Sequence, residues 1–182
     1  MLSEAIHNIY PEMAYVISEN VVTWSDGNID MDLINTEIEK LEVELPKKAA
    51  VVVLNELCDT KTAEAKLYIS GMDISTEQLE RYKEKYKMSL AYKADGSYES
   101  NLTLEANVTG MTVDELADLI ITKGIAYDEA MMTFNSRIEA FRVAVSNLIE
   151  NNELEKVYSI LESARAFDAN TTDEDVAALF EE

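Results

Sequence analysis

Apolar residues recur at helical spacing through most of this 182-residue chain. The longest pattern covers four heptads with steps of three and four, at Ile120, Gly124, Tyr127, Met131, Phe134, Ile138, Phe141, Val145 and Leu148. Such a seam is typical of a coiled-coil-like helix. Thr112 and Glu115 have capping-box spacing and predict its start. Gly124 costs about 1 kcal/mol in a helix interior, so the pattern leaves open one long helix or two with a bend.

Two helices are predicted on the N-terminal side of this seam, separated at Pro46. The first carries the stripe Ile34, Ile38, Leu41 and Leu45 and is expected to end before Pro46. The second starts with Pro46 in its first turn and runs toward Ile69. A strand over 50–54 is the alternative, because Val51, Val52 and Val53 are β-prone.

Further helices are expected over 73–96, over about 98–108 and after residue 153. The first has Ser75 and Gln78 at capping-box spacing, and its expected buried face is Leu79, Tyr82, Tyr86 and Leu90. The last has the stripe Leu154, Val157, Leu161 and Ala164, and its short connection implies antiparallel packing on the long helix.

Residues 14–24, rich in β-branched and aromatic types, predict a short hairpin with its turn at 18–20. The expected fold is therefore mainly α: an antiparallel helical bundle with a long coiled-coil-like helix, plus a small N-terminal β-hairpin module. The expected division is an N-terminal module with an acidic helix over 1–46, a helical bundle over 47–167, and an acidic C-terminal tail with a short helix over 168–182.

Charge excludes some partners. The net charge is −21, and most of it lies in the ends, with ten acids against one base in 1–46 and ten against two in 150–182. Such a surface repels phosphate backbones and anionic membranes, so neither direct nucleic-acid binding nor membrane binding is expected. The helix over 73–96 carries five bases, but acids interleave with them, and the acidic chain ends are expected as their intramolecular partners.

Candidate chemistry is sparse. His7 and Cys58 are the only histidine and cysteine, which leaves neither a zinc set nor a nucleophile with a histidine base, and Cys58 reads as a small core residue. The five glycines are too dispersed for a phosphate-binding loop. No secretory leader or membrane span is expected either. Acid–base catalysis by a pair of carboxylates stays open, but nothing among the 36 acids selects a pair, so no catalytic residue and no cofactor are expected.

One stretch resembles a calcium-binding loop. Read as twelve positions from Asp26, it puts oxygen-bearing side chains at positions 1, 3, 5, 7 and 12, namely Asp26, Asn28, Asp30, Asp32 and Glu37. Met31 stands where the loop needs glycine, and a strand rather than a helix is expected before it. The alternative is a turn at Asp26 and Gly27 followed by a helix that Asp30 or Asp32 caps.

The C-terminal segment carries three apolar residues on an acidic helix capped by Thr171 or Thr172. They are Val176, Leu179 and Phe180, which are candidates for docking on a partner. Folding back on the bundle or fraying is the alternative.

Two segments suggest a family. Residues 5–48 combine a short helix ending in Tyr10 and Pro11, a β-like stretch, a turn from Trp24 to Gly27 and a helix. They resemble the openings of small tail-region accessory proteins of tailed bacteriophages. Residues 75–157 resemble the helical part of phage tail-fibre assembly proteins, on three motifs: Gln78, Arg81, Tyr82 and Lys85; Gly110, Met111, Thr112, Glu115, Leu116 and Ala117; and Glu153 with Leu154.

The resemblance covers about two-thirds of the chain and implies a non-enzymatic tail component or assembly chaperone. Its expected partner is another tail or fibre protein, in the host cytoplasm during assembly or in the virion tail. The helical seam also allows self-association into a homo-oligomer. Two alternatives stand beside this reading: an acidic DNA mimic that inhibits a host nucleic-acid-binding enzyme, and a calcium-dependent binding module using 26–37.

Overall fold

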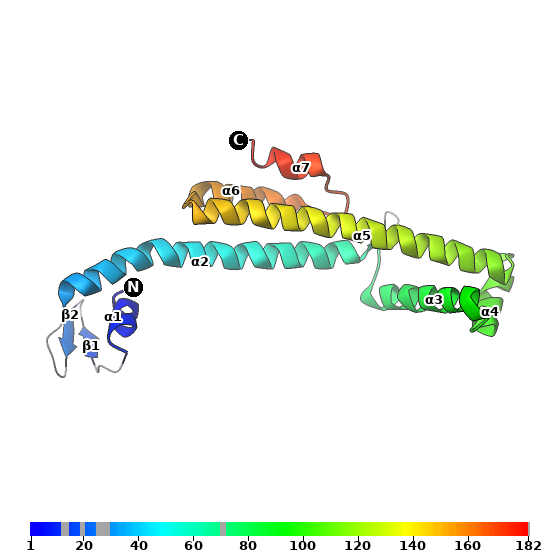
Figure 1. Cartoon of the computed structure of the whole chain (residues 1–182), viewed down its shortest axis with the longest axis horizontal. Coiled ribbons are helices and arrows are strands. Elements are labelled where there is room, and N and C mark those ends of the chain that lie inside the picture. Colours follow the sequence, from blue (N-terminus) through cyan, green and yellow to red (C-terminus); the bar gives the residue numbers. More distant parts are fainter. Residues whose placement is uncertain (12–14, 19–20, 25–29, 70–71, 182) are drawn as a thin grey trace.

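Two long helices that run in opposite directions form the body of the molecule (Figure 1). The computed structural model describes residues 1–11, 15–18, 21–24, 30–69 and 72–181. In chain order the elements are α1 (Leu2–Ile9), β1 (Tyr15–Ser18), β2 (Val21–Trp24), α2 (Met31–Lys66), β3 (Tyr68–Ile69), β4 (Met72–Asp73), α3 (Thr76–Asp95), α4 (Glu99–Thr109), α5 (Val113–Glu150), α6 (Leu154–Ser163), the 3-10 turn η1 (Ala164–Ala166) and α7 (Asp173–Ala178). The expectation of a mainly helical bundle is confirmed.

The helix α2 runs unbroken through Pro46, so the predicted break there is wrong. A proline inside a helix costs about 3 kcal/mol. Packing on both sides of it offsets this cost, because Leu41 and Leu45 contact the N-terminal cluster and Ala50 is fully buried in the main core. Figure 1 shows α2 curving along its N-terminal part, as proline-containing helices do. The predicted boundary at 46/47 therefore falls inside one helix.

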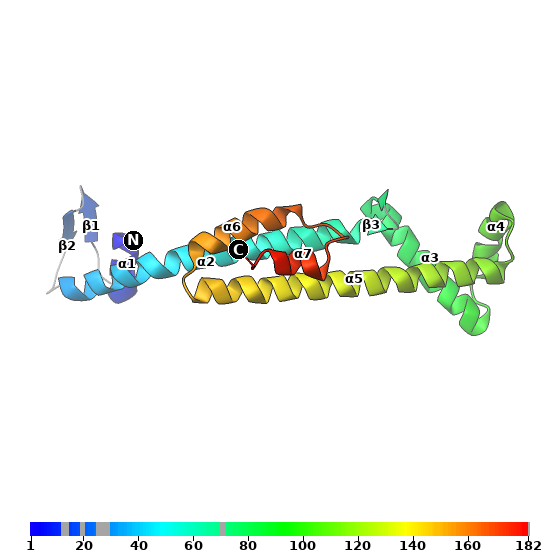
Figure 2. The ribbon, with the colours of Figure 1, turned by 90° about the horizontal axis from the view of Figure 1, so that it is seen from above.

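The open question at 50–54 is settled as helix, since these residues lie within α2. The helix ends at Lys66, earlier than predicted, and Tyr68–Ile69 forms β3 instead. β3 pairs antiparallel with β4, with Tyr68 opposite Asp73. This small ribbon connects α2 to α3 (Figure 2).

The helix α5 is continuous through Gly124 over 38 residues. Its seam is buried from Phe134 onward, although Ile149 rather than Leu148 completes the buried set. N-cap residues were predicted for three helices, and all three helices have one. Ser75 caps α3, Thr112 caps α5, and Thr172, rather than Thr171, caps α7.

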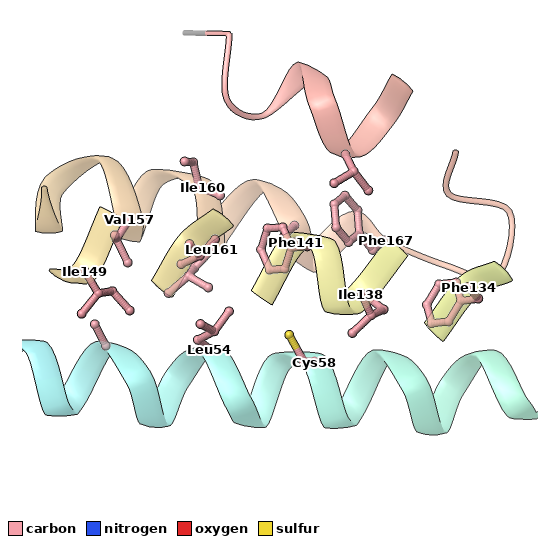
Figure 3. Close-up of a cluster of buried hydrophobic side chains, with 14 of the residues drawn as sticks. Leu54, Cys58, Phe134, Ile138, Phe141, Ile149, Val157, Ile160, Leu161 and Phe167 are labelled. Atoms are coloured by element: carbon pink, nitrogen blue, oxygen red, sulfur yellow. The ribbon is translucent and has the colours of Figure 1, made fainter. Parts of the chain in front are cut away.

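The main core lies where α2, α5 and α6 pack together (Figure 3). Phe141 lies at the centre of this core and is 1% exposed. Its ring contacts the Phe167 ring edge-on, with 5.3 Å between the two centroids. Leu54 and Cys58 come from α2, while Val157 and Leu161 come from α6. As the sequence predicted, α6 packs antiparallel on α5 through a short turn (Figure 1).

Smaller clusters hold the two ends of the molecule. At one end, Ala5 and Ile6 of α1 pack on Ile34 and Leu41 of α2. At the other, α4 packs on the start of α5 in a cluster of Leu102, Ala106, Leu116 and Ala117. The long helices therefore separate two structurally distinct ends (Figures 1 and 2).

Near the N-terminal end, β1 and β2 pair antiparallel, with Tyr15 opposite Trp24 and Ser18 opposite Val21. The turn predicted at 18–20 includes residues 19 and 20, which lie outside the described residues.

The buried face of α3 differs from the predicted one. Leu79 is buried as expected, but Tyr82 and Leu90 are exposed, and Ser89 is fully buried instead. The helix packs mainly against α5, so only a narrow strip of its surface is covered. The bases of α3 pair with acids of α3, α4 and α5, in the pairs Lys83–Glu80, Lys85–Glu105, Lys93–Asp114 and Lys93–Asp118. The expectation that the chain ends would supply these partners is wrong for these lysines.

Candidate interaction groove

Three helices that pack side by side form three grooves, and direct contacts close the one between α2 and α5. Arg142 Nη2 lies 3.3 Å from Asp59 Oδ1, and Lys47 Nζ donates to the backbone oxygen of Glu150 at 3.0 Å. Cys58 is buried beneath Arg142, and burial raises the pKa of its thiol above the ordinary value of 9.0. The thiol therefore stays protonated, as suits a core residue rather than a nucleophile.

The C-terminal segment covers the groove between α5 and α6 (Figures 1 and 2). Val176 is buried in the main core, and Phe180 lies 6.2 Å from Phe141 between ring centroids. Arg137 of α5 anchors the segment, because its Nε donates to Asp173 Oδ1 at 2.7 Å and its Nη1 to the Thr171 oxygen at 2.8 Å.

The third groove, between α2 and α6, is open and has a volume of about 510 Å³. Its lining comes from both helices and from η1: Val53, Glu56, Leu57, Thr60, Lys61, Glu64, Tyr158, Leu161, Glu162 and Arg165. α2 and α6 run in the same direction here, so the groove follows both helices (Figure 1).

The apolar part of the groove remains accessible. Leu161 is buried beneath it and Leu57 is half-buried, while Val53 is 36% exposed and Tyr158 is 45% exposed. These four side chains combine an aliphatic floor with an aromatic ring that has a polar end. Such a surface suits contact with another apolar helix face.

Charged side chains flank this apolar strip. Lys61 Nζ lies 2.9 Å from Glu64 Oε2, and Arg165 Nε lies 2.7 Å from Glu162 Oε2. Both bases of the lining are thus already paired within their own segments. Glu56 is the one lining carboxylate for which the described part of the chain shows no ion pair. The groove therefore presents an excess of negative charge.

The lining of the groove consists of aliphatic, aromatic, hydroxyl and charged side chains. Its lining has no histidine and no cysteine. Across the described residues, no group of three or more histidine, cysteine, aspartate or glutamate side chains could hold a metal ion. Nor does any described helix combine the length and apolarity that crossing a bilayer requires.

The calcium-loop residues are only partly within the described chain. Asp26 and Asn28 lie outside it. Asp30 is the N-cap of α2 and accepts from the backbone N–H groups of Asp32 and Leu33, as the capping alternative predicted. Glu37 accepts from Asn8 Nδ2 at 2.9 Å, and this bond lowers its pKa below the ordinary value of 4.5. Asp30 thus serves helix capping, and Glu37 serves the contact with α1.

The candidate docking residues of the C-terminus pack on the chain's own core. Val176 is buried, and Leu179 and Phe180 are partly buried against the main cluster. This is the arrangement that the fold-back alternative predicted, so the three side chains do not form a free surface.

Sequence reasoning missed the α2/α6 groove. The available signal was Val51, Val52 and Val53, three consecutive β-branched residues that cannot all face one core from a helix.

Searches of known protein families, curated proteins and solved structures found no match to this chain.

Proposed function

We propose that this chain is a non-enzymatic protein that acts through protein–protein contacts, and that the α2/α6 groove is its binding surface. The open groove is the observation that carries the proposal. The other two grooves of the three-helix body are closed, one by direct contacts and one by α7. A partner helix in the third would complete a four-helix arrangement, the common way in which helices cover their apolar faces.

The size of the groove indicates what kind of complex forms. A standard protein–protein interface buries about 1,600 Å² in total. A groove of about 510 Å³ between two helices has room for the side chains on one face of a short helix. Contact at this groove alone gives a transient complex, and additional contacts would make it lasting. Both behaviours suit an assembly factor.

The sequence resemblance supplies the class of partner. It supports a tail structural component or a tail-fibre assembly factor, with another tail or fibre protein as the partner. The alternative function, mimicry of DNA, requires carboxylates arranged in a row along one face of the molecule. The acid-rich N-terminal module lies at one end of the molecule, whereas α7 lies over its middle (Figure 1). This separation favours groove contact over mimicry.

Affinity capture from phage-producing cells tests the proposal. Tagged wild-type chain is expected to recover a tail or fibre protein. Val53→Glu puts a charge into the groove, whereas Val52→Glu makes the same change on the neighbouring residue, which is 54% exposed and does not line it. Only Val53→Glu is expected to abolish capture. Recovery of a nuclease or polymerase would support mimicry instead, and recovery of neither class would reject both.

A further inference from the structure

We propose that the partner of the α2/α6 groove is a basic amphipathic helix of about three turns from another protein. This inference rests on the proposed function and names the chemistry of the partner.

The length of the groove sets the length of the helix. Along α2 the lining extends from Val53 to Glu64. Eleven steps at 1.5 Å each give about 16 Å, which is three helical turns. Along α6 and η1 it extends from Tyr158 to Arg165, seven steps or about 11 Å, so both walls flank about two of these three turns. A longer helix would project beyond the lining.

The segment around α7 shows how such a helix binds this body. It presents Val176 and Phe180, four residues apart, to the groove between α5 and α6. Val176 lies within α7 and Phe180 in the turn that follows it, and both contact the main cluster. The helix also brings a charge that its groove complements, since Asp173 meets Arg137. The partner of the open groove needs the same two features, an apolar ridge and a complementary charge.

In the open groove the complementary charge is positive. Lys61 and Arg165 are already paired with Glu64 and Glu162, so an acidic helix would find no free base in the lining. A lysine or arginine over Glu56 would gain a partner. The net charge of −21 acts in the same direction, because it attracts cationic chains from a distance. Apolar contact provides most of the affinity, and charge selects among helices of similar shape.

A second copy is the nearest competitor for the groove. Its α3 carries Arg81 and Lys87, and the exposed apolar residues Tyr82 and Leu90 lie on the same helix. Two copies of charge −21 repel each other, however, and the bases Lys83, Lys85 and Lys93 are engaged within the chain. The charge balance therefore favours a different, cationic protein.

A displayed library of 12-residue helix-forming peptides tests the proposal against the full chain. Ridge positions vary among Leu, Ile, Val and Phe, and polar positions vary among Lys, Arg, Glu, Asp and Ser. Selected peptides are expected to be net positive. Fluorescence anisotropy should show at least tenfold weaker binding to Val53→Glu and a change within twofold for Val52→Glu. Circular dichroism checks that both variants fold.

A second pair of variants isolates charge. Glu56→Lys is expected to weaken the basic peptides about three- to tenfold at low salt, with a smaller effect at high salt. Glu155→Lys makes the same change at an exposed residue of α6 outside the lining and should leave binding unchanged. Equal effects of the two substitutions would overturn the assignment of charge to Glu56.

The remaining outcomes separate this proposal from the proposed function. Selected peptides that are acidic yet sensitive to Val53→Glu would overturn the basic partner and keep the groove as a binding surface. Selected peptides that are insensitive to Val53→Glu, or the absence of any binder, would overturn both. Sedimentation velocity would show a second copy as a concentration-dependent rise in mass that Val53→Glu and Tyr82→Glu each remove. That result would assign the groove to α3 of another copy and overturn the proposal.

Discussion

The ring of Tyr86 in α3 occupies the space that a side chain at position 124 of α5 would need. A Cβ atom on Gly124 would lie 2.5 Å from Cδ2, 2.7 Å from Cε2 and 2.9 Å from Cγ of that ring. Because Cγ is the root of the ring, a small rotation of the side chain would not relieve the contact. The glycine therefore permits the close approach of α3 to α5 at this point.

We predict that Gly124→Ala destabilises the protein although alanine favours helix. The propensity gain is about 1 kcal/mol. Overpacking against a ring typically costs 1–3 kcal/mol, so a net loss of about 1 kcal/mol is expected in the free energy of unfolding. In the Tyr86→Ala background the same substitution should become stabilising. Urea denaturation of the four proteins measures this coupling, and an equal effect in both backgrounds would contradict it.

Arg137 is predicted to hold the C-terminal segment in place. Arg137→Ala removes the bonds to Asp173 and to the Thr171 oxygen, so α7 should open more often while the core of α5 stays closed. A loss of about 1 kcal/mol corresponds to a roughly fivefold faster amide exchange in 173–180. Hydrogen exchange with mass spectrometry measures this.

Arg165→Ala is the matched control for Arg137→Ala. Its partner Glu162 lies three residues away, and both side chains are largely exposed. Such surface pairs contribute little to stability, so exchange in α7 should not change. Unchanged protection of 173–180 in Arg137→Ala as well would show that apolar contacts alone hold α7.

Local chemistry explains what the sequence could predict. The caps at Ser75, Thr112 and Thr172 depend on residues three positions apart, and all three are present. The exposed faces depend on neighbours far away in the chain. Tyr82 and Leu90 have core spacing, but they are exposed because α3 has too little surface packed against it. Helical periodicity gives a candidate face and not the partner that covers it.

The candidate groove could not be predicted from local sequence patterns for the same reason. Leu57 and Leu161 meet across about a hundred positions of sequence, and no pattern in either helix specifies that pairing. Whether this groove is open also depends on where the C-terminal segment packs. Residues Val176, Leu179 and Phe180 looked available in the sequence, whereas the fold uses them to close the neighbouring groove.

The capping carboxylate Glu115 predicts an acid-sensitive contribution to stability. The backbone N–H and the hydroxyl of Thr112 each donate to Glu115 Oε2 at 2.8 Å, and they hold its pKa below the ordinary value of 4.5. A lowered folded pKa means that the contribution is complete above the unfolded pKa. It is lost as the pH falls through the folded pKa.

Glu115→Gln should therefore lose less stability than the wild type as the pH falls from above 4.5 through the lowered folded pKa of Glu115. Acidification also reduces the net negative charge, which acts on both proteins alike, so the difference between their urea midpoints isolates the cap. Glu129→Gln removes a carboxylate from the middle of α5, away from any cap, and should follow the wild type. Parallel pH profiles for wild type and Glu115→Gln would argue against the capping contribution.

Pro46 predicts a site where one substitution should stabilise the chain. It lies inside α2. There a proline has no N–H to donate to the carbonyl four residues earlier, that of Glu42, and its ring crowds that carbonyl. Pro46→Ala restores the bond and removes the clash, and we expect a gain of about 1 kcal/mol or more in the free energy of unfolding. Lys48→Ala, at an exposed position of the same helix, should change stability little. A loss of stability in Pro46→Ala would contradict this prediction and show that the curved helix is required by the packing on either side of Pro46, at Leu45 and at Ala50.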